Sequence, residues 1–364
     1  MSVMSLIFAF FVAFVAAFVL TPLVGRLAIR HGVLDRPDGG RKQHSRPIPL
    51  WGGLALLAAL VLGVTAAAAV GAVPGTHIKF KFLVGLAAAV GLLTAGGMLD
   101  DKFNLRPGRQ FVWPVLAALA VIASGIGVTY VTNPLGGLVY LNELSVTVLW
   151  WDGLPYKLTV LADLFTLVWL LGMTYTTKLL DGLDGLVVGV TGIGALVLAA
   201  VSLMREVAQP DTAVLAMILA GACFGFLIFN ANPARIFLGE GGSTLCGFAL
   251  GVLAIISGGK IATALLVLGL PILDAALVII RRVVIERRPF SVGDRSHLHF
   301  RLIDAGLSIR ETVLIYYLTA ALFGITTLVL RGWQKILALA LLAALTASLA
   351  WLALRLGRRR QVTE

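Results

Sequence analysis

The stretch TYTTKLLDGLDGLVVG, residues 174–189, places charged side chains between two long apolar runs. Lys178, Asp181 and Asp184 are spaced by three, so a continuous helix would hold them in one stripe with neighbours about 5–6 Å apart. Charges of this kind facing lipid cost about 3 kcal/mol each on insertion scales, so the stripe must face protein or water. A salt-bridged structural trio is the alternative to a functional site.

The composition decides what surrounds this stretch. Of the 364 residues 59% are hydrophobic and 13% are charged, and the mean hydropathy is +0.97. Soluble proteins carry about 25% charged residues, so water is not the main solvent of this chain. The sequence therefore predicts an integral membrane protein.

Apolar runs near the length that a helix needs to cross hydrocarbon recur along the whole sequence. They lie near 3–24, 50–73, 82–99, 110–128, 158–176, 186–203, 212–229, 243–257, 261–280, 312–330 and 334–354. The prediction is an all-α, polytopic membrane protein of about 11 transmembrane helices. No linker divides the chain, so residues 1–364 are expected to form one integral-membrane domain.

The distribution of Lys and Arg predicts the orientation. An odd number of spans puts the termini on opposite sides, and with the N-terminus outside most of the 29 basic residues fall in cytoplasmic segments. The C-terminus is then cytoplasmic. Topology and contact with lipid headgroups account for the net charge of +11, so no nucleic-acid partner is expected. In the outer loop near 129–157, alternating apolar residues fit either a short hairpin or a helix on the membrane surface.

With this orientation, every cytoplasmic loop carries an acidic residue near a helix end. Asp100 and Asp101 begin the second loop, Asp181 and Asp184 lie in the third, and Glu240 lies in the fourth. Clustered carboxylates suit Mg²⁺ shared with a diphosphate, with Mn²⁺ as an alternative ion. Two of these features also have a purely structural explanation. Asp100 and Asp101 could be a solvated pair at the end of a helix, and the turn around Glu240 could cap the following helix through Ser243.

The first and fifth cytoplasmic loops supply cations that suit phosphate oxygens. These loops contain LDRPDGGRKQHSRPIPLWGG (34–53) and RRVVIERRPFSVGDRSHLHFRL (281–302). Positive-inside bias explains some of these residues without any ligand. His297 and His299 would point the same way if their segment were extended, and no histidine or cysteine spacing matches a structural zinc site.

Six motifs, in order, carry a family resemblance: LDRPDGGRKQHSRPIPLWGG (34–53), GMLDDKFNLRP (97–107), LLDGLDGLVVG (179–189), RIFLGEGGS (235–243), PILDAALVIIRR (271–282) and DRSHLHFRLIDAGLS (294–308). The chain resembles the polyprenyl-phosphate N-acetylhexosamine-1-phosphate transferases, glycosyltransferase family 4. The fifth loop is most similar to the undecaprenyl-phosphate enzymes of the WecA kind, which favours a UDP-N-acetylhexosamine over a peptide-bearing donor.

The resemblance implies a Mg²⁺-dependent exchange on the cytoplasmic side of the bacterial inner membrane. The phosphate of undecaprenyl phosphate would attack the UDP-sugar, most simply UDP-N-acetylglucosamine, and release UMP to begin a cell-envelope glycan. One diphosphate linkage replaces another, so catalysis reduces to positioning and charge neutralisation. A homodimer is left open.

The same resemblance assigns the site residues. Catalytic roles are implied for Asp100, Asp101, Asp181, Asp184, His297 and His299, substrate binding for Lys42, His44, Lys178, Arg295 and Arg301, and metal binding for Asp101, Asp184 and Glu240. Asp274 matches a membrane-embedded aspartate for which no role follows.

Three positions depart from the family pattern: Glu240 replaces a usual Asp, Lys178 a usual Asn, and Phe300 a usual third His. Two consequences stay open: Glu240 and Lys178 compensate one another, with Lys178 contacting phosphate or Asp181, or the changes alter the metal affinity or the sugar. Two further hypotheses stay open, a transporter of an anionic substrate and a relative without catalytic activity. A transporter is expected to hold its charges near mid-membrane and to contain related halves, and neither feature stands out here.

Overall fold

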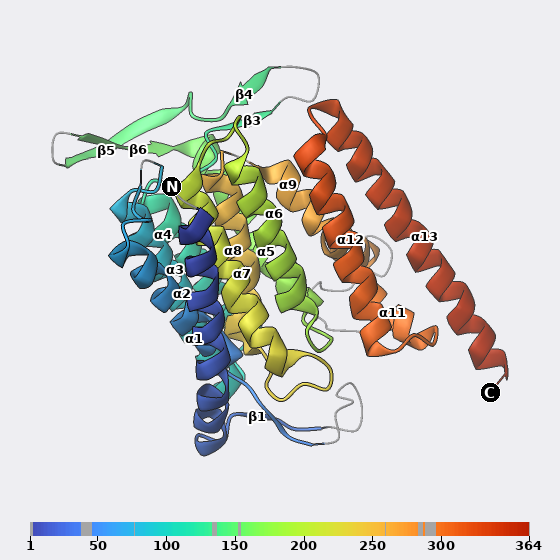
Figure 1. The fold of residues 1–364 in the computed structure, drawn as a ribbon. Coiled ribbons are helices and arrows are strands. Elements are labelled where there is room, and N and C mark those ends of the chain that lie inside the picture. The colour runs from blue at the N-terminus through green and yellow to red at the C-terminus, as the bar shows by residue number, and fades with distance from the viewer. Residues whose placement is uncertain are drawn as a thin grey trace.

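The computed structural model describes residues 3–37, 46–75, 77–132, 137–151, 154–258, 260–282, 287 and 296–363. Helices form nearly all of the structure, and most run roughly alongside one another as a bundle (Figure 1). They are α1 (Val3–Arg30), α2 (Gly52–Ala69), α3 (Phe80–Phe103), α4 (Pro107–Ala123), α5 (Val160–Leu180), α6 (Leu186–Leu203), α7 (Pro210–Asn230), α8 (Gly239–Ile256), α9 (Ile261–Val267), α10 (Gly269–Ile280), α11 (Leu298–Asp304), α12 (Ile309–Val329) and α13 (Trp333–Thr363).

Within the described ranges, nine helices are long and apolar enough to cross a membrane, or ten if the bent pair α9–α10 is one span. The shorter apolar helix α4 matches a further predicted span. The prediction of a multi-pass, all-α membrane protein is confirmed. Each predicted run coincides with a helix or with the bent pair, while the number of crossings and the sides of the termini stay predictions.

The apolar run predicted near 261–280 coincides with two helices, because α9 and α10 meet at an angle of 80°. Leu268 leaves the helical conformation, with φ −92° and ψ 12°. Pro271 follows three residues later and has no N–H to donate to the preceding turn. The apolar composition continues through the break, so hydropathy did not reveal it.

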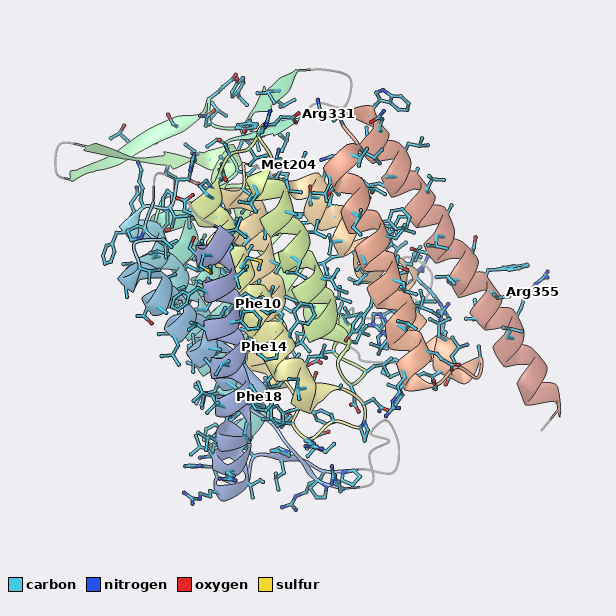
Figure 2. The ribbon with its side chains drawn as sticks, viewed as in Figure 1. Phe10, Phe14, Phe18, Met204, Arg331 and Arg355 are labelled. Atoms are coloured by element: carbon cyan, nitrogen blue, oxygen red, sulfur yellow. The ribbon has the colours of Figure 1, made fainter. Side chains whose placement is uncertain are left out.

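Helix α8 lies at the centre: 89% of its apolar span is buried, against 22% in α1 and in α13. Small residues bring the helices together, as is usual in membranes. A side chain at Gly221 or Gly225 of α7 would lie 2.2 or 2.3 Å from the backbone oxygens of Phe10 or Phe14 of α1. Phe10, Phe14 and Phe18 follow one another along α1 (Figure 2), where Phe10 and Phe14 stack at 6.0 Å.

The two ends of the bundle differ. Antiparallel hairpins lie at the end where the N-terminus is drawn, whereas α11 and β1 lie at the other end (Figure 1). The strands are β1 (Leu34–Asp35), β2 (Ile48–Pro49), β3 (Tyr130–Thr132), β4 (Leu138–Tyr140), β5 (Ser145–Trp151) and β6 (Leu154–Thr159). Of the two alternatives for the loop near 129–157, the hairpin is confirmed, with β3 paired to β4 and β5 to β6.

Candidate active site

The start of α8 inserts between α2 and α3 through glycine contacts. A Cβ added at Gly97 would lie 2.0 Å from the backbone nitrogen of Gly241, and one at Gly53 would lie 2.4 Å from that of Gly242. The glycines that follow Glu240 therefore allow three backbones to meet. The alternative explanation for Ser243, a cap on the start of this helix, is wrong. Its hydroxyl donates to Gly239 O at 3.1 Å within the helix.

Asp101, in the last turn of α3, faces the first turn of α8. Its Oδ1 accepts the backbone N–H of Glu240 at 2.9 Å. Gly239 has φ +70°, and a Cβ there would lie 2.2 Å from Asp101 Oδ2, so only glycine fits. A carboxylate at the N-terminus of a helix interacts favourably with its dipole. This contact joins the second and fourth cytoplasmic loops of the predicted topology.

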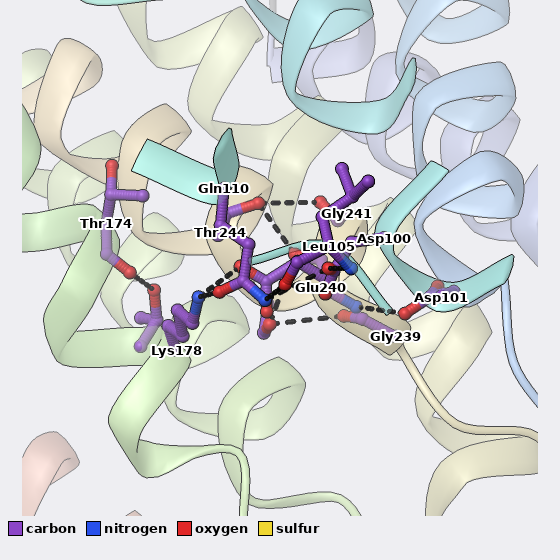
Figure 3. Close-up of polar contacts among 12 residues, drawn as sticks. Asp100, Asp101, Leu105, Gln110, Thr174, Lys178, Gly239, Glu240, Gly241 and Thr244 are labelled. Carbon is purple, nitrogen blue, oxygen red and sulfur yellow. Dashed lines mark hydrogen bonds and ion pairs between the residues drawn. The ribbon is translucent and has the colours of Figure 1, made fainter. Parts of the chain in front are cut away.

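A chain of hydrogen bonds links the other charged groups at this end of the bundle (Figure 3). Lys178 Nζ lies 2.6 Å from Glu240 Oε1 and donates to Gln110 Oε1 at 2.9 Å. Gln110 Nε2 in turn donates to Asp100 Oδ1 at 3.0 Å, and the same oxygen accepts Leu105 N at 2.8 Å. Sequence reasoning missed Gln110, whose only signal was its polarity at the edge of an apolar run.

Asp181 lies just beyond α5, which ends at Leu180. The predicted helical stripe is therefore wrong, because residues 181–185 form a turn and only Lys178 is on the helix. Crowding by protein raises the pKa of Asp181 to about 7, and the charges of Glu240 and Asp101 act in the same direction, whereas the Ser243 hydroxyl opposes them. Part of the side chain stays exposed to solvent, and we expect screening to reduce the rise.

Asp184 fixes this turn to the loop between α7 and α8. Its Oδ2 accepts Asn232 Nδ2 at 2.9 Å and Ala234 N at 3.0 Å. Gly185 N donates to the buried Asn230 Oδ1 at 3.1 Å. The two asparagines were also missed by sequence reasoning, since their partners are 45 and 48 residues away in the chain.

The histidines of α11 reach the same turn. A Cβ added at Gly182 would lie 2.4 Å from His299 Nε2, so the imidazole lies directly against the backbone between Asp181 and Asp184. Burial lowers the pKa of His299 to about 3, with His297 acting in the same direction and Asp274 opposing, so the ring is neutral near pH 7. Neither of its ring nitrogens has a hydrogen-bond partner among the described residues.

Some predicted site residues lie outside the described residues, namely Lys42, His44 and Arg295. Arg301 is described and is half-buried in α11. His297 and His299 were predicted to point the same way if their segment were extended. That segment is not extended, because α11 is helical from Leu298. Their rings nevertheless stack, with centroids 5.7 Å apart and planes 12° from parallel.

The site brings Asp101, Asp181 and Glu240 close enough to influence one another, with Lys178 beside them. In the part of the chain that the structure describes, no three Asp, Glu, His or Cys side chains are arranged as a ready-made metal cage. Mg²⁺ seldom uses such a cage; it keeps several waters and is held by one or two carboxylates and substrate phosphates. The oxygen donors present fit that mode of binding.

A family model and several known proteins are similar to this chain. A family model described as glycosyl transferase family 4 matches residues 82–258, which include α3, the turn after α5 and the start of α8. The chain is 31% identical over 333 residues to the probable undecaprenyl-phosphate N-acetylglucosaminyl 1-phosphate transferase of Bacillus subtilis (strain 168), covering 90% of this chain and 85% of that protein.

Two further relatives are similar over most of their length. The decaprenyl-phosphate N-acetylglucosaminephosphotransferase of Mycolicibacterium smegmatis is 32% identical, over 84% of this chain and 77% of its own. The phospho-N-acetylmuramoyl-pentapeptide-transferase of Heliobacterium modesticaldum is 32% identical, over 83% of this chain and 88% of its own. The similarity therefore spans nearly the whole bundle.

Proposed function

The chain belongs to glycosyl transferase family 4, and we propose that it transfers N-acetylglucosamine-1-phosphate from UDP-N-acetylglucosamine to undecaprenyl phosphate, with release of UMP. The proposal places this reaction on the cytoplasmic side of the inner membrane, at the start of a cell-envelope glycan. The choice of sugar rests on the N-acetylglucosamine named for two relatives.

The convergence of Asp101, Asp181 and Glu240 from three separate segments is the observation that supports the proposal most directly. Lys178 pairs with Glu240, whereas Asp101 and Asp181 are held by the Glu240 backbone N–H and by the Ser243 hydroxyl. A site that receives Mg²⁺ and a diphosphate gives the remaining carboxylates a cationic partner.

In the proposed reaction an oxygen of the lipid phosphate attacks the β-phosphorus of the UDP-sugar. A new P–O bond forms, the bond from that phosphorus to the bridging oxygen breaks, and the oxygen leaves with UMP. Mg²⁺, held by the carboxylates of this site, would supply positive charge that neutralises the phosphate groups. Lys178 and Arg301 would neutralise further negative charge, and the neutral His299 would accept from or donate to a substrate group as its tautomer allows.

The metal proposal keeps the predicted set of Asp101, Asp184 and Glu240 and adds Asp181. Asp101 and Glu240 are adjacent through the start of α8. Asp184 accepts two hydrogen bonds through Oδ2, which orient the carboxylate proposed to help hold the ion. Lys178 holds Glu240 Oε1, so we infer that the ion and Lys178 share this carboxylate. Lys42, His44 and Arg295 are proposed to contact the substrates, as their motifs suggest.

The test uses the purified full chain in detergent with UDP-N-acetylglucosamine and undecaprenyl phosphate. UMP release should require both the lipid phosphate and Mg²⁺. Comparing UMP release from UDP-N-acetylglucosamine with release from UDP-N-acetylgalactosamine identifies the preferred sugar. Asp101→Asn should abolish UMP release. Asp211→Asn is the matched control for that variant, because Asp211 is a buried carboxylate at the other end of α7. Absence of UMP with every UDP-N-acetylhexosamine would contradict the proposal, and substrate flux across liposomes without UMP would favour a transporter.

A further inference from the structure

Asp274 is a buried carboxylate for which the proposed reaction has no use. It lies in α10, only 6% of its surface is exposed, and it faces the start of α11. Its Oδ1 accepts the backbone N–H of Leu298 at 2.8 Å, and its Oδ2 lies 3.0 Å from His297 Nδ1. Each oxygen therefore holds a different part of the segment that carries His297 and His299.

The contact with Leu298 fixes the helix. Leu298 is the first residue of α11, and no side chain of the N-cap residue His297 caps the helix itself. Asp274 accepts from another helix one of the first N–H groups of α11, which have no acceptor within the helix, and a negative charge there also suits the helix dipole. The rotation of α11 about its axis is thereby set from α10.

The contact with His297 fixes the ring. An ionised carboxylate only accepts hydrogen bonds, so Nδ1 must carry the proton and Nε2 is the nitrogen left for another partner. The His297 ring stacks on His299, which lies against Gly182 with no hydrogen-bond partner for either nitrogen among the described residues. A buried imidazole without a protein partner is completed by water, an ion or a ligand group, and it lies here beside the candidate site.

We propose that Asp274 is a positioning residue: it fixes the tautomer of His297 and the placement of α11, and so holds His299 against the turn between Asp181 and Asp184. The expected effect of Asp274 on activity rests on the proposed transferase function. Its effect on the tautomer of His297 and on the placement of α11 follows from the contacts alone. Asp274 touches no substrate in this account and acts through the two histidines.

The chain has five histidines, so 15N labelling of histidine gives a simple spectrum. We expect His297, assigned by its loss in His297→Gln, to show the Nδ1-protonated tautomer in the full-length wild-type protein. Asp274→Asn should shift that signal, because asparagine carries no charge and has one acceptor oxygen for the two donors, His297 Nδ1 and Leu298 N. A His297 signal of the Nε2-protonated tautomer in the wild type would overturn the proposal, even if the variant failed to fold.

Activity supplies the second readout. Loss of a carboxylate that orients a functional histidine typically costs about 10–100-fold, so we expect Asp274→Asn to lower kcat by that factor with little change in KM for the sugar nucleotide. Asp211→Asn is the matched control: Asp211 also accepts backbone N–H groups, from His77 and Ile78, and lies 3.3 Å from a histidine Nδ1, but at the opposite end of the bundle. It should keep wild-type kcat.

Equal activity in Asp274→Asn and wild type would overturn the positioning role. If the wild-type protein released no UMP, the proposed reaction would be refuted. The tautomer measurement would still decide whether Asp274 orients His297. The two failures are therefore distinguishable.

Discussion

Lys178 is the residue that most distinguishes this site electrostatically, because it brings a cation into a cluster of carboxylates. Its ammonium lies 2.6 Å from Glu240, and both side chains are about one-fifth exposed (23% and 19%). Pairing at this depth is sensitive to loss of one partner, since the other is left as an uncompensated charge. We therefore expect Lys178 and Glu240 to behave as one unit.

A double-mutant cycle tests that expectation. Lys178→Met and Glu240→Gln should each lower the thermal stability of the purified protein, and the double variant should lose less than the sum. The coupling is expected to be about 0.5–3 kcal/mol, as for other side chains in contact. Additive losses would show that the ion pair contributes no coupling, and UMP release should fall in all three variants.

The raised pKa of Asp181 predicts how activity depends on pH. An acid whose pKa is raised from 3.8 towards about 7 stays neutral at pH values where an ordinary aspartate is ionised. Since only the ionised form attracts a cation, UMP release at low Mg²⁺ should rise as pH increases through that range. More Mg²⁺ should move the midpoint to lower pH, because metal and proton compete. A midpoint independent of Mg²⁺ would contradict this reasoning.

At this scale, sequence reasoning identified the types of residue but not their contacts. The residues predicted to converge were Asp101, Asp184 and Glu240, because each lies near a helix end on one side of the membrane. In the structure Asp181 lies beside Asp101 and Glu240, whereas Asp184 accepts hydrogen bonds from Asn232 and Ala234. The link through Gln110 was not predictable, since it joins residues 68 positions apart whose meeting depends on how α4 packs. The burial of His299 against Gly182 depended likewise on the path of a distant loop.

Among the elements, the start of α8 depends on glycine for its place between α2 and α3. Gly97→Ala should destabilise the protein by about 1–3 kcal/mol, since the added methyl would meet the backbone of Gly241, which cannot move as a side chain does. Gly91→Ala is the control on the same helix, because nothing lies within 4 Å of its Cβ. Thermal unfolding in detergent compares the two, and equal stability would refute the close contact.

The positions of the helices were predictable, because an apolar run of membrane length leaves few alternatives, whereas some ends were not: α1 continues to Arg30 past the run 3–24, and α13 to Thr363 past the run 334–354. The bend between α9 and α10 was not, since hydropathy reports composition and not direction. The turn after Leu180 shows the same limit: a spacing of three suited a helix, but Gly182 and Gly185 allowed the chain to leave it. Asp181 and Asp184 consequently face different partners.

For the whole molecule, orientation in the membrane is the largest prediction that labelling can test. Both native cysteines, Cys223 and Cys246, are buried, so a membrane-impermeant maleimide should report only introduced ones. Glu143→Cys, exposed beyond the β3–β4 hairpin, should react on intact cells. Gly108→Cys, in open space at the start of α4, should react only after permeabilisation. The reverse pattern would invert the predicted topology.

The proposed reaction requires carboxylates from separate loops to act on one metal ion. Mn²⁺ offers a direct measurement, because the EPR signal of the free ion disappears on binding. Titration of the purified protein with UDP-N-acetylglucosamine present should show one Mn²⁺ bound per chain, with affinity at least about 10-fold weaker in Asp101→Asn and in Asp181→Asn. No bound ion, or an affinity that neither substitution changes, would contradict a shared metal site.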